Sequence, residues 1–104
     1  MNQVLKWLSG GDLRSDGVLN EVVGFVLANK EMLADLYAGL SAPGEVIRGR
    51  TADALEKIAR SQPDWAEDRI PDLIEIARAD EMPMVRFHLA MALGYLAIYQ
   101  DHID

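Results

Sequence analysis

Two histidines are the side chains of this chain best suited to acid–base or metal chemistry. His88 lies in an apolar stretch, and His102 lies in an acidic C-terminal tail with Asp101 and Asp104. A histidine acts as a general base when an acid orients the imidazole beside a substrate pocket. The residues around His88 in the sequence indicate neither. One imidazole and two carboxylates at a chain end make only a weak metal site.

A second candidate is the run of carboxylates formed by Asp64, Glu67, Asp68 and Asp72. Paired carboxylates can hydrolyse glycosides. This spacing is more typical of the solvated N-terminal part of a helix, where negative charge complements the helix dipole. The chain has no cysteine, so disulfides, thiolate metal sites and cysteine nucleophiles are excluded. We therefore expect no enzyme, with no catalytic residue, no metal and no cofactor.

Charge and hydropathy restrict the partners. The chain has 104 residues and a net charge of −7, and no section of it is strongly basic. Since phosphate neutralisation dominates nucleic-acid binding, we expect no nucleic-acid partner. The N-terminus does not resemble a secretion signal, and the most apolar stretch, residues 84–99, is too short and too polar to span a membrane. These features predict a single domain, 1–104, in a cytoplasmic protein without membrane attachment.

Apolar residues recur at helical spacing through most of the chain. They predict an all-α fold with helices near residues 4–8, 19–27, 29–40, 44–60 and 64–79 and from about 84 to 99. Asn29 is a predicted N-cap, Asp64 with Glu67 resembles a capping box, and Pro71 should kink or restart its helix. In the helix at 44–60, Ile47, Thr51, Ala54, Leu55 and Ile58 should be buried, and the pairs Asp53–Lys57 and Glu56–Arg60 should lie outside.

Two segments of the chain nearly repeat each other. The residues Ile47-Arg48, Ala52-Asp53-Ala54-Leu55 and Ile58-Ala59 realign, 38 residues later, on Val85-Arg86, Ala90-Met91-Ala92-Leu93 and Leu96-Ala97. A fixed period of this length is typical of repeats built from paired helices.

These motifs resemble the HEAT-like and armadillo-like α-solenoid repeats, and the chain is similar to small prokaryotic HEAT-like proteins of unassigned function. The resemblance implies a short right-handed α-solenoid of antiparallel helix pairs with about two to three repeats. Residues 1–28 would form N-terminal helices or a degenerate repeat, followed by repeats at 29–61 and 64–100. In this family the arginine that opens the second helix is usually structural, which assigns a structural role to Arg48 and Arg86. For Arg48 and Arg86, Glu45 and Asp80 or Glu81 are possible partners.

The repeat also predicts a binding face. The outward stripe Arg50, Asp53, Lys57 and Arg60 aligns with His88, Met91, Tyr95 and Ile98, and Tyr99 extends the second stripe. Second helices line the usual binding surface of α-solenoids. We therefore expect a protein or peptide partner to bind at a set of seven residues: Arg50, Asp53, Lys57, His88, Met91, Tyr95 and Tyr99.

The last helix is apolar nearly all round, and something must cover it: the N-terminal segment, a partner or a second copy of the chain. The leading hypothesis for the function is therefore a non-catalytic interaction or scaffold module. The alternatives are a homodimeric assembly unit without a separate ligand and, on the family resemblance, a HEAT-like enzyme or accessory protein of the phycobiliprotein lyase type.

Overall fold

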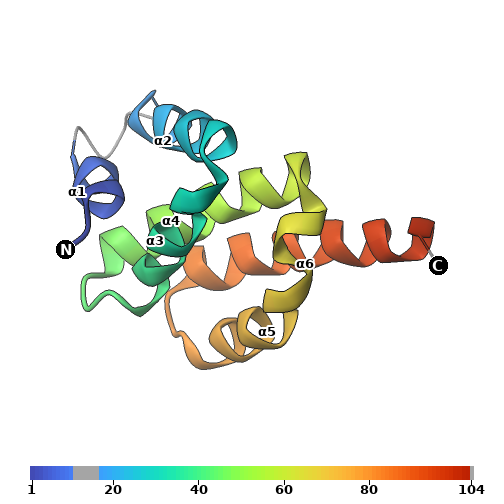
Figure 1. The fold of residues 1–104 in the computed structure, drawn as a ribbon. Coiled ribbons are helices and arrows are strands. Elements are labelled where there is room, and N and C mark those ends of the chain that lie inside the picture. The colour runs from blue at the N-terminus through green and yellow to red at the C-terminus, as the bar shows by residue number, and fades with distance from the viewer. Residues whose placement is uncertain (11–16, 104) are drawn as a thin grey trace.

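A computed structural model describes the backbone of residues 1–10 and 17–103 and the side chains of residues 1–10 and 18–101 (Figure 1). This part of the chain is helical and contains no strand, which confirms the all-α class. The α-helices are α1 (Gln3–Ser9), α2 (Gly17–Ala28), α3 (Leu33–Tyr37), α4 (Glu45–Ser61), α5 (Ile70–Ala79) and α6 (Pro83–Ile103). Three 3-10 segments, η1 (Lys30–Met32), η2 (Ala38–Ser41) and η3 (Pro63–Arg69), lie between them. His102 and Asp104, named above for their chemistry, lie outside the described side chains.

Helix α4 is the centre of the fold. It packs against α6 in the largest interhelical interface and also contacts α1, α2, η2 and η3. This position explains its small residues, because Ala52, Ala54 and Ala59 are buried and let neighbouring helices approach closely. The predicted inner face is confirmed for Thr51, Ala54, Leu55 and Ile58, and Ile47 is half-buried.

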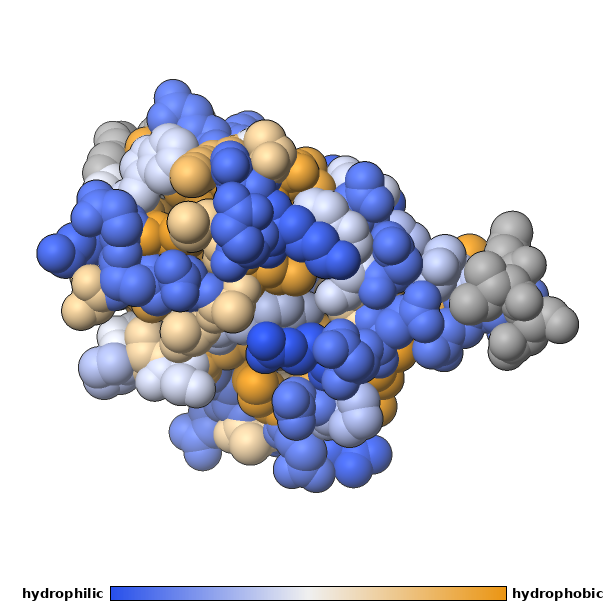
Figure 2. Space-filling view, in the orientation of Figure 1, coloured by the Kyte–Doolittle hydropathy of each residue, from blue (hydrophilic) through white to orange (hydrophobic). Residues whose placement is uncertain are grey.

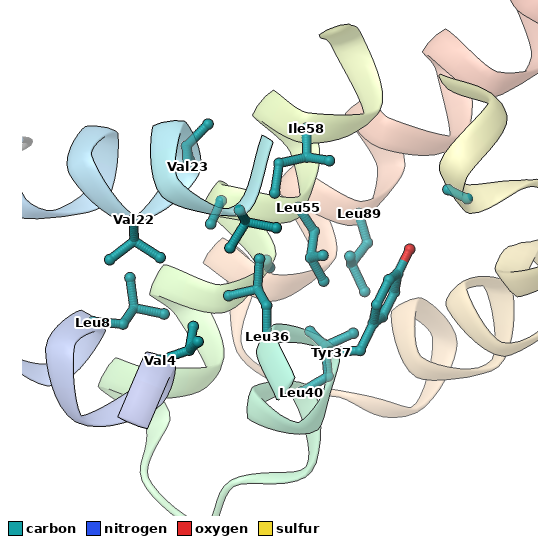
Figure 3. Packing of buried hydrophobic residues seen from close by; sticks show 14 of the residues in the cluster. Val4, Leu8, Val22, Val23, Leu36, Tyr37, Leu40, Leu55, Ile58 and Leu89 are labelled. Atoms are coloured by element: carbon teal, nitrogen blue, oxygen red, sulfur yellow. The ribbon is translucent and has the colours of Figure 1, made fainter. Parts of the chain in front are cut away.

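The hydrophobic core joins the two ends of the chain. Figure 3 shows Leu8, Val22 and Leu36 converging from α1, α2 and α3, while Leu55 and Leu89 come from α4 and α6. Leu8, Val22, Leu36 and Leu89 have no exposed surface. The N-terminal helices therefore complete the core on the α4 side.

Several helix ends differ from the sequence predictions. Asn29 occupies the predicted N-cap position, but its side chain makes no cap bond and instead donates to the Phe25 carbonyl at 2.9 Å. The predicted helix over residues 29–40 is divided into η1, α3 and η2. Asp64 does not cap, since η3 begins at Pro63 after Gln62. A new helix, α5, does begin at Ile70 with Pro71 in its first turn, as predicted.

One N-cap was not predicted from the sequence. Asn2 accepts a hydrogen bond from the Leu5 amide at 2.9 Å through Oδ1, which caps α1. Its Nδ2 donates to the Asp35 carbonyl at 2.9 Å. The Asn2 side chain thus caps the N-terminus of α1 and also links α1 to α3.

Tyr37 provides a prediction about alkaline unfolding. Burial raises the pKa of its phenol to about 12, although the Arg69 guanidinium, 4.2 Å from the ring centroid, lowers it. Because the folded pKa exceeds the unfolded value of about 10, this contribution to stability is complete below pH 10. It is lost as the pH rises towards 12. We expect the free energy of unfolding to fall by up to about 2–3 kcal/mol across that window.

Denaturant titrations at pH 9 and above would measure this loss, with Tyr37→Phe as the control. The variant should be less sensitive to alkali than the native chain. Equal alkaline sensitivity of the two chains would show that Tyr37 does not cause the loss.

Candidate functional site

The two stripes predicted to face outwards do so only in part, since their middle residues meet between α4 and α6. Helices α4 and α6 lie side by side and run in the same direction (Figure 1). Asp53 and Lys57 on α4 and His88 on α6 are half-buried between the two helices. The expectation of two fully outward stripes was therefore wrong, because the aligned faces of neighbouring repeats are close enough to pack together.

Arg50, another predicted binding residue, bonds to α1. Its Nη1 donates to the Leu8 carbonyl at 2.7 Å and to the Gly10 carbonyl at 3.0 Å. These carbonyls lie at the C-terminal end of α1, where the helix leaves acceptors without an internal partner. In this structure Arg50 therefore fastens α1 to α4.

A compact polar cluster forms where α4 crosses His88. The His88 Nδ1 atom lies 3.7 Å from Asp53 Oδ1 and 3.8 Å from Glu56 Oε1. Lys57 donates to Asp53 Oδ1, which confirms the predicted pair. The orienting acids that were not evident beside His88 in the sequence are thus supplied by α4.

Glu56 was expected on the outer side of α4, paired with Arg60, and this expectation was wrong. Its side chain is only 6% exposed, whereas Arg60 is exposed. Among the described residues, Glu56 Oε2 and His88 Nδ1 are buried without a hydrogen-bond partner. Such groups are uncommon in folded proteins, because burying them without a partner is costly.

Arg48 bonds to the loop before α6 and to the turn before α4. Its Nε donates to Asp80 Oδ2 at 2.9 Å, and Nη1 donates to the Ala42 and Pro43 carbonyls. Burial raises the pKa of the Asp80 carboxyl, but hydrogen bonds from Arg48 and the Met82 amide outweigh this effect, so the pKa is lowered. The aligned arginine, Arg86, is exposed beside a groove between α5 and α6.

A wide hollow in the described part of the chain adjoins this ion pair. Its volume is about 640 Å³, and Glu45, Arg48, Asp80 and Glu81 line it with apolar neighbours. The arginine and Asp80 are bonded to each other and hold the loop before α6. We therefore assign this hollow a structural origin.

The three remaining predicted binding residues follow α6. Met91, Tyr95 and Tyr99 are all half-buried. Partial burial raises the pKa of the Tyr99 phenol, and the nearby carboxylates of Glu67 and Asp64 raise it further. Tyr95 and Tyr99 line a hollow of about 290 Å³ together with Ala59, Arg60, Pro63 and Ile98.

The outer face of α6 includes residues that were not among the predicted binding residues. Met84, Phe87, Met91, Gly94 and Ile98 follow one another at intervals of three and four residues, which places them on one side of the helix. The core residues of α6, Val85, Leu89, Ala92 and Leu96, occupy the opposite side. We call the first set the outer stripe.

The outer stripe is strongly exposed at its large residues. The exposed fractions are 45% for Met84, 61% for Phe87 and 60% for Ile98. The last turns of α6 project beyond the other helices in Figure 1, and Figure 2 shows this end extending from a surface that is mostly hydrophilic. Neither α1 nor α2 is among the main neighbours of α6, so these two helices do not cover this face.

Searches of protein-family models, curated proteins and solved structures find no match to this chain. No helix in the described part of the chain is both long enough and apolar enough to cross a membrane. The geometry of α4 and α6 is therefore the main indication of function.

Proposed function

We propose that this protein is a non-catalytic interaction module that assembles with a second copy of itself through the outer stripe of α6. The observation that carries the proposal is the exposure of large apolar side chains, above all Phe87, on the side of α6 opposite the core. Contiguous exposed apolar surface is typical of protein interaction sites. A second copy would cover this surface.

The spacing of the outer stripe suits a helix as its occupant. Apolar residues at alternating intervals of three and four form the contact seam of paired helices, where each side chain fits between residues of the facing helix. The small residues Ala90, Gly94 and Ala97 on and beside the stripe allow a close approach. A Cβ atom added to Gly94 would have no heavy atom within 4 Å, so there is open space at this point.

The stripe is complementary to itself in an antiparallel pair. A two-fold axis between Met91 and Gly94 would place Phe87 opposite Ile98 of the second copy and Met91 opposite Gly94. The long side chain of Met91 would then face Gly94, which has no side chain. Each copy would contribute the same patch, as a closed dimer requires.

Charge also favours a second copy in this orientation. Residues 87–100 contain no aspartate, glutamate, lysine or arginine, so two acidic chains can meet here without repulsion along the seam. Arg86 and Asp101 bracket this neutral segment. Antiparallel packing brings the Arg86 end of one copy to the Asp101 end of the other, whereas parallel packing brings like charges together.

The proposed architecture is a short HEAT-like solenoid of two to three repeats. The support for it is the parallel packing of α4 and α6, each preceded by shorter helical segments, as expected for second helices of neighbouring repeats. In this arrangement His88, Tyr95 and Tyr99 flank the outer stripe on the side of α4.

A protein or peptide partner is the second candidate for α6. The hollow lined by Tyr95 and Tyr99, with Arg60 at its edge, favours it. Tyrosine and arginine are enriched at protein interfaces.

The mass of the native chain in solution distinguishes the two candidates. Light scattering after size exclusion, repeated from low to high micromolar concentration, should give the mass of a dimer at the higher concentrations. The mass of one chain throughout that range would overturn self-association and leave the heterologous partner as the function.

A further inference from the structure

The Asp53–Glu56–His88 cluster has the composition of a metal site. Asp53 and Glu56 are three residues apart on α4 and therefore project from the same face, and His88 approaches them from α6. One ligand atom from each residue lies within 4.8 Å of the other two. The cluster thus joins two helices that are distant in sequence.

Burial provides a second, independent indication that a ligand belongs there. Glu56 is 94% buried by the exposure of its side chain, yet its Oε2 has no hydrogen-bond partner among the described residues. The Nδ1 atom of His88 is also buried and without such a partner. An imidazole nitrogen and a carboxylate oxygen that are buried in the same cluster without a hydrogen-bond partner are groups that a cation would satisfy.

We propose that Asp53, Glu56 and His88 bind one divalent transition-metal ion, which links α4 to α6. One imidazole nitrogen with two carboxylate oxygens suits Zn²⁺, Co²⁺ or Mn²⁺, and the chain has no thiolate that would favour a softer ion. This inference does not depend on dimer formation, because all three ligands come from one chain.

The distances are compatible with this ion after small movements of the side chains. Ligand atoms about 2.0–2.2 Å from a tetrahedral Zn²⁺ lie roughly 3.4 Å from one another. The separations of 3.7 and 3.8 Å from His88 Nδ1 are slightly longer than this. The side chains of His88 and Asp53 are 15% and 17% exposed, so solvent reaches the edge of the cluster.

Lys57 is the group that competes with the metal. Its ammonium binds Asp53 Oδ1, the oxygen nearest His88. With Lys57 in place the cluster carries one positive and two negative charges when His88 is neutral. A divalent ion would replace the ammonium at Asp53, and Lys57, whose side chain is 28% exposed, would turn to solvent. Removing this lysine should therefore strengthen metal binding.

The experiment is calorimetric titration of the full chain with Zn²⁺, with Co²⁺ absorption as a second readout. The chain should carry no histidine tag and should contain His102→Ala, so that His88 is the only imidazole. We expect one ion per chain. Glu56→Gln and His88→Gln should each weaken binding by at least about tenfold, and Lys57→Gln should strengthen it several-fold. The exposed Glu75→Gln on α5 is the matched control and should bind as the parent does.

Thermal unfolding separates loss of the site from loss of the fold. At a fixed metal concentration, metal should raise the melting temperature of the parent and of Glu75→Gln clearly more than that of Glu56→Gln. Absence of binding to the folded parent would overturn the proposal. So would equal affinity in the parent, Glu56→Gln and His88→Gln, since that result would mean adventitious binding to surface carboxylates.

Discussion

A chain carrying Phe87→Glu is expected to sediment as a monomer at concentrations where the native chain is a dimer. Phe87 is 61% exposed in the single chain and faces the proposed partner helix. The substitution places two carboxylates in one apolar interface because the dimer is symmetric, and buried charges without partners are strongly disfavoured. The dissociation constant should rise by at least about 100-fold, or about 2.7 kcal/mol.

The stability of the monomer should change little, since Phe87 contributes to no part of the core. Denaturant titration of the variant under monomeric conditions checks this. Asn20→Glu, which adds the same charge at an exposed position of α2, is the control and should remain a dimer. If Phe87→Glu dimerises as tightly as the native chain, the outer stripe is not the interface.

The second large effect is expected at Gly39, where η2 approaches α4. A Cβ atom at this position would lie 2.1 Å from Thr51 Oγ1 and 2.8 Å from Leu5 Cδ2. Thr51 is fully buried and β-branched, so it has little freedom to rotate away. Gly39→Ala should therefore lower the free energy of unfolding by about 2–4 kcal/mol, even though alanine favours helical conformations.

A double-mutant cycle with Thr51→Ala identifies the cause. This change removes the hydroxyl that the new Cβ would contact, and Thr51 Oγ1 has no hydrogen-bond partner among the described residues. Gly39→Ala should cost clearly less in the Thr51→Ala chain than in the native chain. Gly24→Ala is the matched control, because no heavy atom would lie within 4 Å of its Cβ. Equal losses in both backgrounds would rule out the contact as the cause.

Helical periodicity predicted much of the fold because it records which side of each helix is buried. Leu19, Val22, Val23 and Val26 in α2 and the inner face of α4 are buried as expected. The restart at Pro71 also followed from local chemistry. The division of the helix predicted over residues 29–40 did not follow from periodicity, and its last segment packs through Gly39 against Thr51, a contact between elements that are distant in sequence.

The polar cluster could not be predicted from the sequence for the same reason. Asp53 and Glu56 are 32 or more residues from His88, and only the packing of α4 on α6 brings them together. The repeat predicts two equivalent helices but does not show how close together they lie. Asp53, Lys57 and His88 are therefore predicted to point outwards, although they lie between α4 and α6. The exposed position of Phe87 could have been predicted from the sequence, because the three- and four-residue spacing of the outer stripe lies within α6 alone.

The most direct test of the proposed assembly is chemical crosslinking of single-cysteine chains. The native chain has no cysteine, so each engineered thiol is unique. In the antiparallel pair, Met91 lies close to the two-fold axis, whereas the two Phe87 positions are about 16 Å apart along the helix. A short bismaleimide should therefore link Met91→Cys chains into dimers efficiently and Phe87→Cys chains poorly. Efficient linkage at both positions would indicate parallel packing, and linkage at neither would contradict assembly through α6.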